Sequence, residues 1–418
     1  MHDFVRALFP ITRSLTGPGT RETLRVIKQH LPDLTIKEVP SGTRAYDWEV
    51  PDEWTIRSAK LIGPDGEPVV DFAKNNLHVV GYSIPIDGIF TLDELKPHIY
   101  SRPDMPDAIP YVTSYYNRHW GFCMNQRQRD RLKPGNYRAI IDADLKPGSL
   151  TYGELIIPGE TKEEVFFSTY VCHPSMANNE LSGPAVTTWI AKWVNAAPRR
   201  FTYRFVFIPE TIGSIVYLSK HLDHLKSNVK AGFNISCVGD ERCYSFLPSR
   251  LGASLSDRVA RHVLDHHAVD YIRYTFLDRG SDERQYCSPG ADLPIASIMR
   301  SKFGTYPEYH TSLDDLDLVT PAGLAGTLEA YIKAVRLIEA NAIWKTAVIG
   351  EPQLGKRGLY PTVSVANGAL KVRTMMNVLA YADGSRDLID IAETIGADGL
   401  ICAEIIEELS EHGLLCRL

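Results

Sequence analysis

The sequence lacks the features of secreted, membrane-spanning and disulfide-bonded proteins. Its seven cysteines are an odd number and include no CxxC pair, so we expect reduced thiols. No stretch reaches the roughly 18 apolar residues that a membrane-spanning helix requires. The start of the chain, MHDFVRALFPITRSL, has neither the basic start nor the apolar run and small-residue cleavage site of a signal peptide. We therefore expect a cytoplasmic protein with no membrane partner.

The sequence also lacks a strong excess of charge of either sign. A net charge of -6 and a pI near 6.1 give no general field that would attract phosphate backbones. We found no low-complexity tract and no long internal repeat. With 44% hydrophobic and 23% charged residues, the chain has the composition of a globular protein that folds throughout. Nucleic acid is not an expected partner.

The length and texture of the chain predict several domains. A chain of 418 residues exceeds what one hydrophobic core usually organises. Residues 45–148 contain short β-rich runs such as AKLI, PVVDFA, LHVVGYSI and YRAIIDADL, which predict a small inserted β domain. We assign residues 1–44, which carry two helical patterns, and residues 149–345 to one larger catalytic domain.

The larger domain alternates between strand-like and helix-like segments. The expected strands are ELIIPG, EEVFFSTYV, TYRFVFIP, AGFNISCVG and PIASIM. The expected helices are GPAVTTWIAKWVNAA, GSIVYLSKHLDHL, SLSDRVARHVLDHH and PAGLAGTLEAYIKAVRLIEANAIW. This alternation predicts an α/β fold, in which a mostly parallel sheet is covered by helices on both faces.

Residues 350–418 form a separate C-terminal pattern. Three helical patterns, VRTMMNVLAYA, DLIDIAETIG and LICAEIIEELSEHG, precede a final LLCRL, an order that predicts a winged-helix module. The second and third helices hold many acids and no Lys or Arg, so contact with phosphates would be repulsive. We expect a module for protein contact or self-association.

Four polar residues follow buried strands or lie in the neighbouring loops. They are His173, Glu210, Asp240 and His310. Each has a simpler reading alone: a loop histidine bonds the backbone, and a glutamate favours a helix N-terminus. Ligands of open α/β sheets nevertheless gather beyond the carboxyl ends of the strands. Four polar residues at equivalent strand ends or in the neighbouring loops therefore favour one shared site.

The chemistry of these groups points to metal-dependent hydrolysis. Imidazole, carboxylate and amide oxygen are suitable ligands for zinc. A water held by zinc loses a proton near neutral pH, and a nearby unligated glutamate can act as general base. We predict that Glu210 takes this role.

The ordered motifs resemble a known family. His173, an amide or acid ahead of Ser182-Gly183, Glu210 in PETIGS, Asp240 and a late His310 look like the di-zinc exopeptidases of the bacterial leucyl aminopeptidase type. CHPSMANNELSGP, GSDERQY, EYHTSLDDLD and FPITRSLTGPGTRETL narrow the resemblance to bacterial aminopeptidase-like proteins with an inserted β domain and a C-terminal winged helix, known as a domain of unknown function. The resemblance covers essentially the whole chain. It implies an aminopeptidase-like mixed sheet flanked by helices.

Two positions depart from the aminopeptidase pattern. Asn179, followed by Glu180, stands where the family has an aspartate that bridges two zinc ions. Glu210-Thr211 stands where the family has two glutamates, the first a base and the second a ligand. One carboxylate that would bind a metal ion directly is therefore missing. We expect one tightly held zinc ion, or a second ion that is bound weakly.

The resemblance implies the following metal ligands. They are His173, Asn179 or Glu180, and Asp240, with His310 near. Asp314 and Asp315 follow His310 and either orient its imidazole or cap a short helix.

The segment GSDERQY is dense in polar groups and resembles one that lies near the substrate. Asp282 could hold a substrate ammonium and Arg284 a carboxylate, with Tyr286 beside them. The alternative is a solvated surface turn. The aromatic run YVTSYYNRHWGF, residues 111–122, either forms a wall above the site or fills the core of the β domain.

We therefore expect a zinc-dependent hydrolase of the aminopeptidase type. Its substrate would be a peptide or a small-molecule amide, attacked by metal-activated water with Glu210 as general base. The alternative is a catalytically silent aminopeptidase-like scaffold that acts as a binding or regulatory protein.

Overall fold

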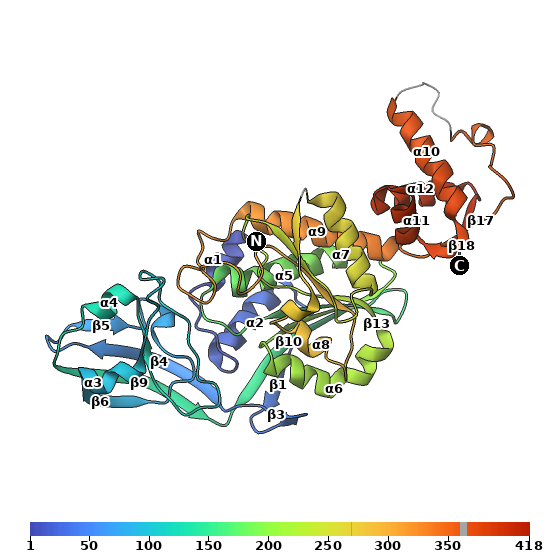
Figure 1. Cartoon of the computed structure of the whole chain (residues 1–418). Coiled ribbons are helices and arrows are strands. Elements are labelled where there is room, and N and C mark those ends of the chain that lie inside the picture. Colours follow the sequence, from blue (N-terminus) through green and yellow to red (C-terminus); the bar gives the residue numbers. More distant parts are fainter. Residues whose placement is uncertain (269, 360–365) are drawn as a thin grey trace. The chain divides into compact units, whose positions relative to one another are not determined.

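The computed structural model describes residues 1–268, 270–359 and 366–418 (Figure 1). The chain divides into two compact units, residues 1–252 with 272–328 and residues 253–271 with 329–418. In the described ranges, no helix is both long and apolar enough to cross a lipid bilayer.

An eight-stranded sheet organises the first unit, in the order β1-β10-β12-β11-β13-β16-β14-β15. Its central strands β12, β11, β13 and β16 run parallel, whereas β1, β10 and β14 pair antiparallel with their neighbours. The α/β class with a mixed sheet is confirmed. The strands are β1 (Thr35–Pro40), β10 (Ser149–Ile157), β11 (Glu164–Tyr170), β12 (Thr202–Ile208), β13 (Val229–Asn234), β14 (Tyr244–Leu247), β15 (Tyr271–Arg273) and β16 (Ile295–Met299).

Helices flank this sheet because its central strands are apolar on both faces. Phe166 of β11 packs against Tyr217 and Tyr286, which belong to α6 and α8. The next residue, Phe167, points to the other face and stacks on Phe205, and α2 and α5 contact strands β10 and β11. The helices are α1 (His2–Leu8), α2 (Pro18–His30), α5 (Ser182–Asn195), α6 (Ile212–Asn228) and α8 (Glu283–Tyr286).

The inserted segment forms an antiparallel four-stranded sheet in the order β5-β4-β9-β6. The expected strand over residues 77–84 is wrong: it holds a 3-10 turn at Asn76–His78 and irregular backbone, because its apolar side chains are buried without alternation and Tyr82 has a positive φ of 65°. The elements are β2 (Arg44–Ala45), β3 (Trp48–Glu49), β4 (Glu53–Ile62), β5 (Pro68–Asp71), β6 (Ile86–Thr91), α3 (Leu92–Leu95), β7 (Ile99–Tyr100), β8 (Phe122–Cys123), α4 (Gln126–Asp130) and β9 (Asn136–Lys146).

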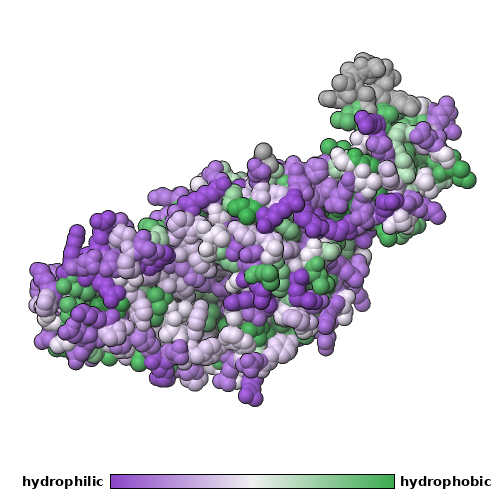
Figure 2. Space-filling view, in the orientation of Figure 1, coloured by the Kyte–Doolittle hydropathy of each residue, from purple (hydrophilic) through white to green (hydrophobic). Residues whose placement is uncertain are grey.

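The inserted sheet and the large sheet share one buried core. A single cluster joins Trp54 and Ile141 of the inserted sheet to Tyr152 and Phe166 of the large one. Hydrophilic residues cover most of the face shown in Figure 2, and its hydrophobic residues form small separate areas. The apolar side chains of this cluster therefore join the inserted sheet to the large sheet.

The second unit contains the expected C-terminal helices and a small antiparallel sheet, β18-β17-β19. Strand β18 was not expected, because its sequence DGSRD has low strand propensity. Arg258 of α7 forms ion pairs with Asp387 and Asp390 of this unit. The elements are α7 (Leu255–His267), the end of α9 (Pro321–Ala340), β17 (Ile343–Thr346), α10 (Ala366–Tyr381), β18 (Asp383–Asp387), α11 (Leu388–Ile395), α12 (Gly399–Glu411) and β19 (Leu415–Arg417).

Gly183 allows helix α5 to lie close to the sheet, and its replacement tests this contact. A Cβ atom at Gly183 would lie 2.5 Å from the carbonyl oxygen of Ile235 and 2.5 Å from Oγ1 of Thr169. We predict that Gly183→Ala lowers the free energy of unfolding by about 2 kcal/mol, since backbone must move. The control Gly290→Ala meets nothing within 4 Å and should change stability by less than about 0.5 kcal/mol. Urea unfolding measures both, and equal effects would contradict the close approach.

Candidate active site

The loop between β11 and α5 carries the first predicted site residues on strained backbone. Ser175 and Met176 have positive φ values of 51° and 49°, and residues 177–181 form a π-helical turn in which all five side chains are buried. Non-glycine residues in such conformations cost about 1–3 kcal/mol each and cluster at functional sites. The loop is therefore held in place by its surroundings.

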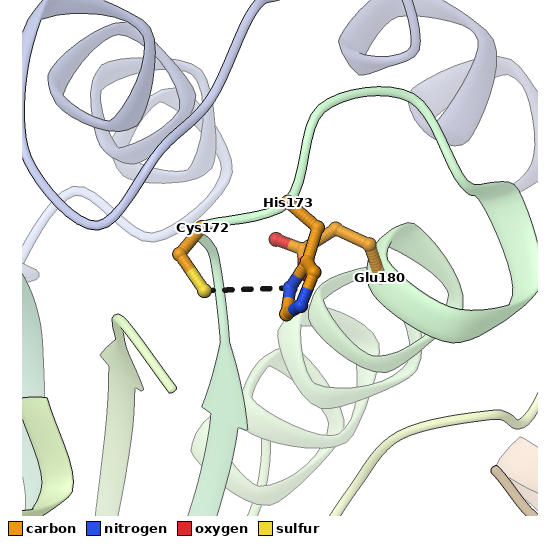
Figure 3. Close-up of side chains that lie close together, drawn as sticks. All are labelled: Cys172, His173 and Glu180. Atoms are coloured by element: carbon orange, nitrogen blue, oxygen red, sulfur yellow. Dashed lines mark hydrogen bonds and ion pairs between the residues drawn. The ribbon is translucent and has the colours of Figure 1, made fainter. Parts of the chain in front are cut away.

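His173 lies at the start of this loop and is 2% exposed. Figure 3 shows its imidazole beside Cys172 and Glu180. Its Nδ1 lies 2.8 Å from Oε2 of Glu180 and 3.4 Å from Sγ of Cys172. Metal-binding histidines usually donate one ring N–H to a carboxylate and bind with the other nitrogen. Glu180 therefore orients His173, whose free nitrogen, Nε2, lies 3.7 Å from Oε2 of Glu210.

Charge around His173 governs its protonation. Burial lowers the pKa of the imidazole, but the nearby Cys172 and Glu180 outweigh burial and raise this pKa well above its usual value. Without a metal the ring therefore carries a proton on both nitrogens, and a cation bound at Nε2 would displace the proton there. In the described part of the chain, the side chains of Cys172, His173 and Glu180 form a group of possible metal donors, with one ligand atom of each within 4.8 Å of the others. Burial raises the pKa of the Cys172 thiol to about 11, so this thiol is neutral without a metal, and a metal ion bound to it would deprotonate it.

His310 comes from a distant loop and lies beside His173. The two ring centroids are 5.4 Å apart, and the ring of Tyr111 lies 5.3 Å from His173 and 5.1 Å from His310. Burial and the neighbouring His173 lower the pKa of His310 to about 3, so its imidazole is neutral. Its Nε2 atom is buried without a hydrogen-bond partner among the described residues. An imidazole in this state has a lone pair available for a cation.

Asp240 does not join the two histidines. Its two oxygens accept hydrogen bonds from Nδ2 of Asn178, from the backbone N–H of Arg242, and from both the backbone N–H and the hydroxyl of Ser301, at 2.9–3.0 Å. A carboxylate has about four lone-pair sites, so these donors occupy them. The prediction that Asp240 shares an ion with the histidines is not met in this arrangement.

Asn179 and Asp314 stabilise the π-helical turn. Nδ2 of Asn179 donates to the hydroxyl of Tyr170 at 2.8 Å, and its Oδ1 is buried without a partner in the described chain. Asp314 accepts the backbone N–H groups of Asn178 and Asn179 and the hydroxyl of Tyr306. Asp314 therefore caps this turn rather than orienting the imidazole of His310.

A tight turn presents Glu210 at the end of β12. The N–H of Ile212 donates to the carbonyl of Glu210 at 2.8 Å, and Thr211 between them has φ 64° and ψ -79°, the rare and strained γ-turn geometry. The Glu210 side chain is 19% exposed. Burial raises the pKa of its carboxyl, and the nearby His173 opposes this rise.

Asp282 supports this turn from inside the protein. Its Oδ1 accepts the N–H of Thr211 at 2.7 Å and the hydroxyl of Ser214 at 2.8 Å. Burial and the charge of Glu210 raise the pKa of Asp282 to about 8. Asp282 has no solvent exposure, so it cannot hold a substrate ammonium without a rearrangement. It acts instead through the position of Glu210.

The other residues of the GSDERQY segment divide into buried and exposed. Tyr286 has no solvent exposure and its hydroxyl bonds Oγ of Ser168 at 2.8 Å, so the prediction that it touches substrate is wrong. Arg284 is exposed, donates to Oγ1 of Thr211 at 2.6 Å, and lines a cavity of about 420 Å³ together with Glu210. Only Arg284 of the three predicted substrate residues is open to a ligand.

Arg13 is a site residue that the sequence pattern did not reveal. Its guanidinium is fully buried, donates to the carbonyls of His173, Ser175 and Leu8, and lies 3.7 Å from Glu180. Burial lowers its pKa to about 10, so it remains charged at neutral pH. The signal in the sequence was the motif FPITRSLTGPGTRETL, which contains Arg13 but does not show which groups it contacts.

The donors that remain fit one metal ion better than two. Nε2 of His173 and the unpartnered Nε2 of His310 are nitrogen donors of the kind that zinc prefers. No carboxylate takes the bridging place of Asn179, whose neutral amide cannot balance two divalent charges.

Replacement of the buried Arg13 tests whether its contacts with Glu180 and the three carbonyls stabilise the protein. We predict that Arg13→Met lowers the free energy of unfolding by about 3 kcal/mol, because it leaves Glu180 without its cation and three carbonyls without a donor. Arg6→Met is the matched control, since Arg6 is 61% exposed and pairs only with the exposed Asp3 among ionised partners in the described chain; it should cost less than about 0.5 kcal/mol. Chemical denaturation distinguishes them, and a small effect at both positions would refute the role of Arg13.

Comparisons with known proteins agree with the fold. Residues 2–341 match the family described as Domain of unknown function (DUF4910), and residues 342–417 match a winged helix-turn-helix family. A Clostridium acetobutylicum protein, named provisionally as a polysaccharide biosynthesis protein with aminopeptidase-like domain, is 44% identical over 95% of this chain and 92% of its own length. A crystal structure from Clostridium acetobutylicum, designated provisionally as a peptidase, matches with a TM-score of 0.94 and 42% identity, over 100% of this chain and 96% of that one.

More distant structures show the fold alone. A zinc aminopeptidase from Bacillus subtilis matches with a TM-score of 0.56 and 15% identity, over 80% of this chain and 93% of that one. An aminopeptidase from Aneurinibacillus matches with a TM-score of 0.52 and 14% identity, over 80% and 92%. The chain therefore belongs to the DUF4910 family, in which an aminopeptidase-like α/β fold precedes a C-terminal winged helix.

Proposed function

We propose that this protein is an amide hydrolase of the aminopeptidase type, with Glu210 as general base and one zinc ion held by His173 and His310. The observation that carries the proposal is the position of Glu210, which lies 3.7 Å from Nε2 of His173 and borders a cavity of about 420 Å³. A bound zinc ion would supply an acidified water at this point.

The environment of Glu210 suits proton transfer. Burial raises the pKa of its carboxyl, and a base is most effective when its pKa approaches the working pH. Glu210 takes a proton from the attacking water and returns it to the leaving amine. The strained turn at Thr211, held by Asp282, keeps the carboxylate aimed at the cavity.

The histidines have complementary roles in this proposal. The contact with Glu180 leaves Nε2 of His173 as the ligand atom. His310 is neutral and its buried Nε2 lacks a partner among the described residues. The ligand role proposed from the sequence for Glu180 changes to that of a positioning residue.

A catalytically silent scaffold is the second candidate, and two observations favour it. The oxygens of Asp240 are already occupied by four hydrogen bonds, and Asn179 supplies no charge. A site with two imidazoles and few free carboxylates binds zinc more weakly than a full aminopeptidase site. The name of the Clostridium acetobutylicum relative, which concerns polysaccharide biosynthesis, directs the choice of test substrates toward amides attached to sugars as well as peptides.

The role of Glu210 predicts a specific loss of turnover. Glu210→Gln should lower kcat for amide hydrolysis at least about 100-fold, because the amide cannot accept the proton of water. Zinc content should remain unchanged. Glu163→Gln is the control, since Glu163 is 44% exposed and pairs with Lys230. Amine release from aminoacyl and N-acyl sugar amides is the measurement, and turnover that survives in Glu210→Gln excludes this residue as the base.

The role of His310 predicts a loss of metal. Protein purified without chelator should hold about one zinc per chain by elemental analysis, and His310→Ala should lower this content at least about 10-fold, as loss of one of few ligands does. The exposed His412 offers a matched control, and His412→Ala should retain zinc. Wild-type protein that binds no zinc and shows no turnover would favour the silent scaffold.

A further inference from the structure

The cavity beside Glu210 has exposed aromatic walls. Trp48 is 40% exposed, Tyr115 37% and Tyr116 51%, and all three line the cavity of about 420 Å³ that also contains Glu210 and Arg284. Trp48 and Tyr116 lie 6.3 Å apart, centroid to centroid, with their planes inclined by 55°. These rings therefore form an exposed, angled aromatic wall of the cavity.

These aromatic side chains are fixed before any ligand arrives. The hydroxyl of Tyr116 donates to the carbonyl of Glu49 at 2.6 Å, which joins the ring to the β2–β3 hairpin that carries Trp48. The hydroxyl of Tyr46 in the same hairpin donates to the carbonyl of Leu218 in α6 at 3.2 Å. A prearranged wall loses little side-chain entropy when it binds.

Two residues that line the cavity have strained backbone, and a third lies in the neighbouring hairpin. Tyr115 and Thr211 line the cavity with positive φ values of 45° and 64°, and Tyr46 in the hairpin has a φ of 53°. Such conformations are rare for residues with a Cβ atom, and they persist where the surrounding structure enforces them for a function. The strain supports a binding role for the cavity rather than an accidental hollow.

The polar groups of the cavity match a ligand with hydroxyl groups and one reacting amide. Thr113 and Ser114 donate their hydroxyls to the carbonyl of Gly81, which leaves oxygen lone pairs to accept from a ligand, and Asn117 adds an amide that can donate and accept. The exposed Arg284 makes no ion pair within 4.0 Å in the described ranges, and only its bond to Thr211 is seen there. Leu15, Ile212 and the aromatic rings make most of the lining apolar, which suits the C–H face of a sugar and also an aliphatic side chain, so a leucine amide is the competing ligand in the test.

We propose that this cavity binds the sugar ring of an N-acyl amino sugar, with the C–H face of the ring on Trp48 and Tyr116 and its amide at Glu210. The C–H groups of a sugar ring carry slight positive charge and pack on the negative face of an aromatic ring. The inference rests on the proposed hydrolase function. In the reaction, the oxygen of water bonds to the acyl carbon, the C–N bond breaks, and the amine of the sugar receives the proton that Glu210 took from water.

Binding of N-acetyl-D-glucosamine to the full-length protein tests the subsite without requiring turnover. Isothermal titration should give saturable binding that Trp48→Ala weakens about tenfold and that Trp48→Phe, which keeps a ring, largely restores. Trp193→Ala is the matched control, because Trp193 is 39% exposed on α5 and is not among the residues that line this cavity. The affinity of L-leucinamide should not depend on Trp48.

The possible outcomes distinguish failure of the sugar subsite from failure of the proposed hydrolase function. Absence of saturable sugar binding, equal losses in Trp48→Ala and Trp193→Ala, or an equal Trp48 dependence for leucinamide would each overturn the sugar subsite. Sugar binding without release of acetate from N-acetyl-D-glucosamine would leave the subsite standing and count against the hydrolase. Release of amine from leucinamide without sugar binding would support the hydrolase function and count against the sugar subsite.

Discussion

A buried chain of charges between Arg13, Glu180 and His173 is the interaction on which the site depends. The side chains of Arg13 and Glu180 are completely buried, and a buried charge is tolerated only when it is paired and hydrogen-bonded. Arg13 meets this requirement from the N-terminal segment and at the same time binds the carbonyls of the strained loop. The orientation of the His173 ring therefore follows from a residue 160 positions away.

In this protein, the fold does not decide which donor atoms of the site are free. The fold agrees with that of the Aneurinibacillus aminopeptidase and the Bacillus subtilis zinc aminopeptidase, which this chain matches at 14–15% identity. At the strand ends of this chain, Asp240 and Asp314 bind protein donors and Asn179 carries no charge. A shared fold therefore does not transfer a two-metal mechanism, since chemistry is set by which atoms remain free.

Sequence patterns predicted the main elements well and the contacts of single polar side chains less well. Periodicity identified β11, β12 and α5 because their apolar residues repeat at the spacing of buried strands and helices. It failed for residues 77–84 and 383–387, where local turns and neighbouring strands decide the conformation. Tyr286 looked like a polar contact of the substrate, but its ring fills the core beside Phe166.

By itself, the sequence determined the α/β class and the central strands of the large sheet, and hence the strand-end loops that contain His173 and Glu210, because these features depend on local hydrophobic spacing. It did not predict β1, β14 or β15, nor the antiparallel pairing of β1, β10 and β14. Only the tertiary structure decided which neighbours of His173, Glu210 and His310 remain free to bind a ligand. Asp240 is satisfied by Asn178 and Ser301, which lie 62 and 61 positions away, and Glu180 by Arg13. Hydrogen-bond partners from distant segments leave no trace in spacing, so the availability of a donor atom becomes known only when the chain is folded.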